Sequence, residues 1–332
     1  MKNIKELIKN VLNFTEENKY EFILPNKTAM IQNKDITDEK IDSKKSVDDV
    51  KNIYTSIDVN LEYVKVKYNS MISSDVIIRE FNLTARNRQY KAFLLFIDGL
   101  VNTDLINNYV LKPLMLKNTA NSFDGDQNHV ISEAVTNNIT VRKVRKFDIV
   151  SYISNCLLPQ NSINKFSKFS DIFAGVNSGN CALFIDTLDI AFDIDVKGFK
   201  QRNVDSANNE IVIKGPQEAF VENIRTNTSL VRRAVNSENL VIENIKVGKI
   251  SQTNCAVCYL ADIANADLVA EVKYRMNNLD IDSLISSGQL EQLISENNKY
   301  SIPQILSTER PDKVTKYLYQ GRVAVIVNGN PY

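Results

Sequence analysis

Short apolar runs of strand length alternate along this chain with stretches in which apolar residues recur at helical spacing. Residues 92–97 form a typical run, which Asp98-Gly99 ends. A run of this length fits a buried strand and is far shorter than the ~20 apolar residues that a membrane-spanning helix needs. Strands that alternate with helices favour an α/β fold, and we expect two mixed α/β subdomains, each a small sheet with packed helices.

The charge balance limits the classes of partner. The 332 residues include 40 basic and 40 acidic side chains, for a formal net charge of zero. Nucleic-acid binding usually requires a basic excess on one face, so we expect no nucleic-acid partner. We find no signal-peptide core and no uninterrupted apolar run of ~18 residues, and therefore expect no membrane span within the chain. Its four cysteines are few for this length and indicate a reducing compartment.

The length predicts about two domains, and the composition suggests where they lie. Residues 1–45 are mixed in charge and poor in apolar side chains, which predicts a flexible N-terminal tail or linker. We place the first α/β subdomain at residues 46–200 and the second at residues 210–330. The polar stretch 198–209 connects them.

The hydrophobic periodicity and the helix caps predict the individual elements. In the first subdomain we expect strands at 75–81, 91–97, 182–187 and 190–196, and helices at 46–61, 103–116, 141–158 and 163–175. In the second subdomain we expect strands at 240–247 and 255–263, helices at 216–235, 266–278 and 289–297, and a last helix and strand within 311–327.

The predicted helix at 216–235 is the leading candidate for an interface. Its apolar positions leave one broad polar face. Two interpretations stay open: a solvated surface helix whose basic C-terminal end complements the helix dipole, or a polar interface onto a neighbouring subdomain or subunit. The residues of this face are Gln217, Glu218, Glu222, Asn223, Arg225, Asn227, Arg232 and Arg233.

Asp98 and Gly99 form a second candidate site, because they follow a strand and precede a helix. In open α/β sheets, ligands gather at the carboxyl ends of strands, where Asp98 would hold a ligand amine or a metal. The alternative is a structural turn in which Gly99 adopts a positive φ.

Other motifs argue against an enzyme. Cys255 and Cys258 have Cys-x-x-Cys spacing, but they lie within an apolar strand, where residues three apart face opposite sides. The single histidine, His129, lies in a polar loop. The loop at 175–180 has the composition of an anion-binding nest, and equally that of a helix C-cap and connector. We find no nucleophile elbow, Walker loop or dinucleotide fingerprint, so we expect no catalytic residues, no metal and no cofactor.

Three segments resemble the A subunit of bacterial spore germinant receptors, the GerA family. They are residues 98–101, 215–233 and 307–331, and the last contains Ser307-Thr308-Glu309-Arg310-Pro311-Asp312-Lys313-Val314 and Gln320-Gly321-Arg322-Val323-Ala324-Val325-Ile326-Val327-Asn328-Gly329-Asn330-Pro331. The resemblance extends from about residue 47 to the end of the chain. It implies the soluble N-terminal region of such a subunit, with the membrane region absent from this chain.

The resemblance also implies partners and a location. They are the B and C subunits, other A subunits and a small nutrient, an amino acid or a sugar, in the spore inner membrane, with this region on the cytoplasmic (spore core) side. Two functions stay open: a module for receptor assembly and germination signalling, which the polar helix favours, and a nutrient-binding sensor resembling two-lobed solute-binding proteins. In the first, the two subdomains would rotate against each other, and residues 311–327 would relay the movement to the membrane region.

Overall fold

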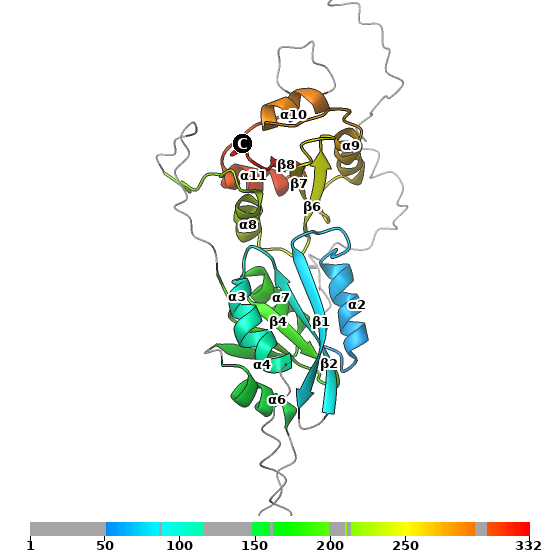
Figure 1. Cartoon of the computed structure of the whole chain (residues 1–332), viewed down its shortest axis with the longest axis vertical. Helices are drawn as coiled ribbons and strands as arrows, with labels where there is room; N and C mark the ends of the chain where they lie inside the picture. The colour runs from blue at the N-terminus through cyan, green and yellow to red at the C-terminus, as the bar shows by residue number, and fades with distance from the viewer. Residues whose placement is uncertain are drawn as a thin grey trace, which may run out of the picture. The chain divides into compact units, whose positions relative to one another are not determined.

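We describe the protein from a computed structural model (Figure 1), which describes residues 51–85, 88–115, 148–159, 162–198, 210, 214–295 and 304–332. The predicted tail at 1–45 and His129 lie outside these residues. Asp49–Tyr332 forms one compact unit that contains two sheets, of five and three strands. The subdomain boundaries at 46–200 and 210–330 therefore stay a prediction, whereas the two-sheet α/β fold is confirmed.

The first sheet has the strand order β1-β2-β4-β5-β3, and all neighbouring strands are antiparallel. Its strands are β1 Val76–Ala85, β2 Arg88–Ile97, β3 Ile163–Phe166, β4 Cys181–Ile185 and β5 Ala191–Ile194. The side chains of β2 alternate between two cores: Leu94 and Phe96 belong to one, and Phe93 and Leu95 to the other. Both faces of β2 are therefore buried, and helices pack against both sides of the sheet.

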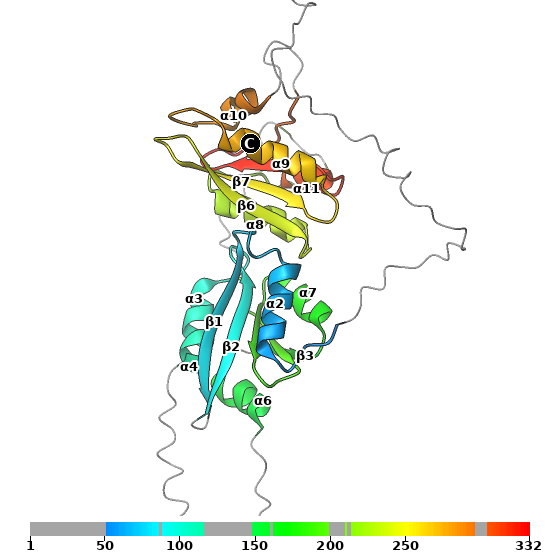
Figure 2. The ribbon, with the colours of Figure 1, turned by 90° about the vertical axis from the view of Figure 1, so that its right-hand side faces the viewer.

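Two sets of helices form these cores (Figure 2). Helices α2 Ile57–Lys67 and α7 Phe169–Asn177 cover one face. The other face is covered by α3 Thr103–Leu105, the π-helical segment η1 Ile106–Leu111, α4 Lys112–Met115, α6 Ile149–Tyr152 and the π-helical segment η3 Ile153–Leu157.

The second sheet repeats this arrangement with the antiparallel order β6-β7-β8. Its strands are β6 Leu240–Val247, β7 Thr253–Leu260 and β8 Ala324–Val327. Helices α8 Ile224–Ala234 and α11 Pro311–Leu318 pack on one face, and α9 Ala266–Asn277 and α10 Ser287–Ile294 pack on the other. Cys258 belongs to the first of these cores and Cys255 to the second, which confirms that they face opposite sides of the strand.

Two predicted helices begin later in the structure than expected, because residues before them form backbone pairs with other segments. Residues 163–166 form strand β3, which pairs with β5, and α7 begins only at Phe169. The helix predicted at 46–61 begins at Ile57, because the preceding segment pairs with residues 167–169: the Ile53 amide donates to the Ser167 carbonyl at 2.8 Å. Helical spacing in the sequence did not reveal these partners.

The helix predicted to begin at residue 216 begins instead at Ile224. Asn223 caps it, since its side-chain oxygen accepts from the amides of Arg225 and Thr226 at 2.9 and 3.2 Å. The buried Asn227 side chain bonds both the amide and the carbonyl of Val221, at 2.7 and 2.5 Å, and holds the preceding segment outside the helix. The helix predicted from Thr103 does begin there, but its cap is Asn102.

Candidate interface between the two sheets

Arg232 of α8 is the central residue of the contacts between the two sheets. Only 1% of its surface is exposed. Its guanidinium donates to both carboxylate oxygens of Asp75, at 2.8 and 2.9 Å, just before β1 of the first sheet. Further bonds reach the Leu240 carbonyl at 2.9 Å and the Ser237 carbonyl at 3.4 Å. Because the guanidinium is planar and presents its donors as a fork, it holds the carboxylate in one orientation.

The segment that carries Asp75 also bonds to the edge of the second sheet. The Ser74 amide donates to the Ile242 carbonyl at 2.8 Å, and the Ile242 amide donates to Ser73 Oγ at 3.3 Å. Ser74 Oγ accepts from the Asn244 amide at 3.0 Å. Strand β6 is an edge strand of its sheet, so these bonds satisfy backbone groups that would otherwise stay unpaired.

A second ion pair joins Asp98, after β2, to Arg225 in the first turn of α8. Gly99 adopts the positive φ of +90° expected of the turn, and a Cβ added there would lie 3.2 Å from Ser229 Cβ. The absence of a side chain at this position therefore lets α8 approach closely. The strand-end rule that suggested a ligand at Asp98 applies to parallel sheets, whereas this sheet is antiparallel.

Glu238, between α8 and β6, makes a third set of contacts. It pairs with Lys67 at 3.3 Å and accepts from Asn177 Nδ2 at 3.5 Å. The Tyr68 hydroxyl donates to Asn177 Oδ1 at 3.2 Å, and burial raises the pKa of Tyr68 well above its ordinary value. Tyr68 therefore stays neutral and acts as a hydrogen-bond donor at physiological pH.

Of the predicted interface residues, Arg225 and Arg232 contact the residues Asp98 and Asp75, which flank strands of the first sheet. Glu218 pairs with Arg233, Asn223 and Asn227 fix the start of α8, and the Glu222 carbonyl accepts from the Gly329 amide at 2.7 Å. Gln217 is exposed. We define the joint as the set of polar contacts between the layers of the two sheets, made by Lys67, Ser73, Ser74, Asp75, Asp98, Asn177, Arg225, Arg232, Glu238, Ile242 and Asn244.

Apart from Asp98, sequence reasoning missed the half of the joint that lies on the side of the first sheet. Ser73, Ser74 and Asp75 form a polar cluster directly before a strand. Such a cluster is typical of an ordinary turn, so only the arginine on the other side reveals its role.

Other candidate sites have structural explanations. Burial raises the pKa of the Cys255 and Cys258 thiols to about 12, so both pack as apolar residues. The loop at 175–180 ends α7 as a C-cap, in which the Asn180 amide donates to the Gly175 carbonyl at 3.0 Å. Among the described residues, no group of three or more histidine, cysteine or acidic side chains is placed to hold a metal. Within the same residues, no helix is both long and apolar enough to cross a membrane.

Comparisons with known proteins agree with this architecture. Residues 62–332 match the family described as Bacillus/Clostridium GerA spore germination protein. Spore germination protein KA of Bacillus subtilis (strain 168) is 30% identical over 280 residues, which are 84% of this chain and 46% of that protein. Spore germination protein A1 of the same strain is 40% identical over 156 residues, which are 47% of this chain and 32% of that protein. The chain thus spans less than half the length of these relatives.

A solved structure extends the similarity to the fold. The crystal structure of the N-terminal domain of the A subunit of the Bacillus megaterium spore germinant receptor GerK3 superimposes with a TM-score of 0.57 and 29% identity. The match covers 85% of this chain and 94% of that one. Because the family match reaches from α2 to the last residue, it includes both sheets and the joint. This chain therefore belongs to the Bacillus/Clostridium GerA spore germination protein family.

Proposed function

We propose that this chain is the N-terminal region of a spore germinant receptor A subunit, and that it serves receptor assembly and nutrient-triggered germination signalling. The names of the relatives and the GerK3 structure support this assignment. By the same reasoning, its partners are the B and C subunits and other A subunits. Its location is the spore inner membrane on the core side, with a membrane region in the rest of the protein.

The observation that carries the signalling role is the double contact of helix α8. Its arginines Arg225 and Arg232 bind the first subdomain. Its apolar residues, among them Leu230 and Val231, share a core with Val314 and Leu318 of α11 and with Ile326 of β8. A shift of the first subdomain against α8 would therefore reach the terminal helix and strand through packed side chains.

Charge reversal at Asp98 and Arg225 tests this role in spores that carry the complete receptor. Both side chains are partly exposed, so reversal leaves the core intact. We expect Asp98→Lys or Arg225→Glu alone to impair germination at normal receptor abundance, and the double reversal to restore it. Normal germination with both single variants, at receptor levels equal to wild type, would show that the joint carries no signal.

The second candidate is a nutrient-binding sensor. The charged groups of the joint are paired with each other, which does not favour a ligand between the subdomains. A separate cavity of about 290 Å³ beside α2 favours a sensor within the first subdomain instead. Thermal unfolding against amino acids, sugars and nucleosides distinguishes the two functions, since a ligand that binds only the folded state raises the midpoint.

A further inference from the structure

Two of the most exposed large apolar side chains in the described part of the chain lie at one end of the second sheet. Ile250, in the turn between β6 and β7, is 78% exposed, and Ile285, just before α10, is 77% exposed. A single exposed isoleucine needs no explanation, but these two come from segments that contact each other. We call residues 248–252 and 280–286 together the apolar tip.

Hydrogen bonds hold the two segments of the apolar tip side by side (Figure 2). The Ile250 amide donates to the Asp282 carbonyl at 2.8 Å. Ser251 Oγ accepts from the Leu284 amide at 3.1 Å, directly before Ile285. The two exposed isoleucines are therefore carried on one fixed framework.

The backbone of the turn is hydrogen-bonded within the tip. Each amide of residues 249–252 donates to a carbonyl of the tip, which belongs to Ile281, Asp282 or Gly248. The Gln252 side-chain amide adds a bond to the Gly248 carbonyl at 3.1 Å. Because hydrocarbon offers no hydrogen-bond partner, a turn can enter a bilayer only where its backbone groups are bonded internally. The amides of this turn meet that requirement.

Charge and area favour a lipid surface over a protein partner. Lys249 pairs with Asp280, and both side chains are largely exposed. The exposed Lys246 of β6 is balanced by the exposed Asp282, so the charges at this end cancel and offer no charged complement to a second protein. The exposed surface of two isoleucines is also far below the ~800 Å² per partner that a stable protein interface buries.

The last residues of the chain lie at the same end of the sheet. Ser287 Oγ, two residues after Ile285, donates to Asn330 Oδ1 at 3.2 Å. Tyr332 is 38% exposed, and tyrosine is a residue that membrane proteins place at the bilayer surface. Under the proposed function, the membrane region belongs to the part of the protein that follows this N-terminal region. A bilayer would then lie next to the apolar tip.

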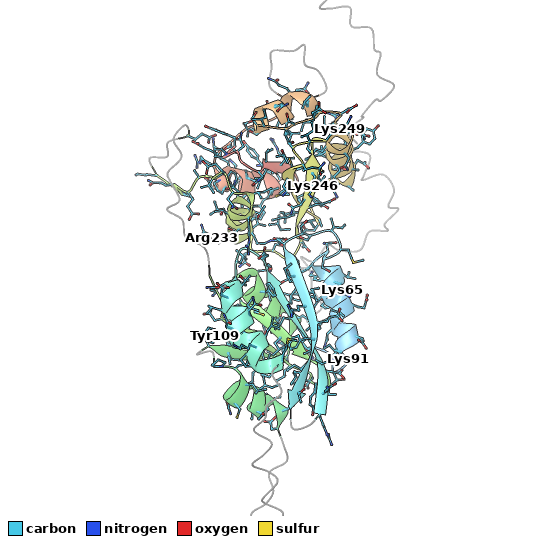
Figure 3. All side chains as sticks on the ribbon, in the orientation of Figure 1. Lys65, Lys91, Tyr109, Arg233, Lys246 and Lys249 are labelled. Carbon is cyan, nitrogen blue, oxygen red and sulfur yellow. The ribbon has the colours of Figure 1, made fainter. Side chains whose placement is uncertain are left out.

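We propose that the apolar tip rests in the surface of a phospholipid bilayer, with Ile250 and Ile285 among the acyl chains. Lys246 and Lys249, which Figure 3 shows along β6 and in the turn that follows it, keep their ammonium groups among the headgroups. This contact fixes the orientation of the second sheet against the membrane. The inference rests on the proposed function, whose membrane region supplies the bilayer, and adds a second, peripheral contact to it.

Flotation of the full chain with phosphatidylcholine vesicles tests the contact. We expect the double variant Ile250→Asp with Ile285→Asp to lower the partition into vesicles about tenfold or more, because carboxylates do not enter the acyl region. Val66→Asp is the matched control: this side chain of α2 is 73% exposed, and its substitution should leave the partition unchanged. Because the charges of the tip cancel, adding phosphatidylglycerol or ~0.5 M salt should change the partition less than about two-fold.

Crosslinking in spores that carry the complete protein separates lipid from protein as the occupant. We expect p-benzoylphenylalanine, incorporated in place of Ile285, to form adducts with phospholipid on illumination. Adducts with another protein chain in place of phospholipid would overturn the proposal and make the tip a protein interface.

Two results with vesicles would also overturn the lipid contact. One is the absence of wild-type binding at about 5 mM lipid, and the other is equal binding by the double aspartate variant. Membrane fractionation of the complete protein keeps these results separate from the proposed function. A complete protein that stays in the membrane fraction without vesicle binding by the tip refutes the tip alone, whereas its absence from that fraction refutes the proposed location as well.

Discussion

Arg232 shows how a single side chain connects two cores. Burial of a guanidinium is costly unless its donors are satisfied, and here they reach a carboxylate, two carbonyls and Ser73 Oγ. Since the carboxylate directly precedes β1 of the first sheet and the carbonyls belong to residues at and just before the start of β6 of the second sheet, the arginine is satisfied only when the two sheets are packed together. Its partner Asp75 is nearly as buried, with 11% of the side chain exposed.

We predict that Arg232→Met lowers the free energy of unfolding by about 3–5 kcal/mol, because it leaves the Asp75 carboxylate buried without its partner. The double variant Arg232→Met with Asp75→Leu should lose less than the sum of the single variants, since no unpaired charge remains. Denaturant unfolding measures both. Lys249→Met is the control: its pair with Asp280 is largely exposed, and its loss should cost less than about 1 kcal/mol.

Asp193 of β5 gives a prediction for pH dependence. Burial raises the pKa of its carboxyl above the ordinary 3.8, although Asn180 Nδ2 donates to it at 2.8 Å. A raised folded-state pKa contributes stability that is present below pH 3.8 and is lost as the pH rises through the folded-state pKa. Asp193→Asn removes this titration. The difference in unfolding free energy between wild type and Asp193→Asn should therefore change as the pH falls from neutral towards 3.8, with wild type becoming more stable relative to the variant.

Chemical denaturation at several pH values checks this expectation. The exposed Asp189→Asn, on the turn between β4 and β5, controls for the loss of one acidic residue. A wild-type minus Asp193→Asn difference that stays constant over this range would contradict the assignment of the pH dependence to Asp193.

Helix α11 and strand β8 form the element through which the proposed signal leaves the second sheet. Pro311 occupies the first helical position, where its missing N–H costs nothing, and Leu318 is fully buried. Gly321, with φ of +79°, ends the helix and turns the chain into β8. Strand β8 then pairs with β7, so the helix and both strands share one core.

Tyr317→Pro should break the last turn of α11, because proline removes an amide donor and clashes with the preceding turn, at a cost of about 3 kcal/mol or more. In spores, we expect assembled receptor with impaired germination. Tyr317→Ala keeps the helix and is the control. Normal germination by Tyr317→Pro at wild-type receptor abundance would exclude α11 from the signalling path.

For the molecule as a whole, the balance of charges governs its solubility. The formal net charge is zero at neutral pH and the isoelectric point is about 6.6. With no net repulsion between copies, we predict a solubility minimum within about one pH unit of that value. Polyethylene glycol precipitation across the pH range measures it. A minimum well outside this interval would indicate that residues of one charge sign are specifically masked in the folded chain.

The sequence alone was sufficient to predict most of the strands, the terminal helix and strand, and the family of this protein. Apolar alternation located seven of the eight strands of the two sheets, and glycine and proline positions located the terminal helix, turn and strand. These signals are local: a strand such as β2, buried on both faces, is apolar throughout its buried part whatever lies beside it. The motifs that resemble the GerA family could also be read from the sequence alone, and the family match over residues 62–332 confirms the resemblance.

The features that only the tertiary structure decided are those that depend on residues distant in the sequence. The weakly apolar segment at 163–166 became a strand because β5 lies beside it, and the segment before Ile224 stayed outside the helix because Asn227 binds its backbone. The same holds for the joint. The sequence identified Arg232 as one of several charges on a polar face, but its burial against Asp75 depends on two residues 157 positions apart meeting in space. Local patterns fix which elements form, whereas the pairing of buried charges is settled only when those elements pack.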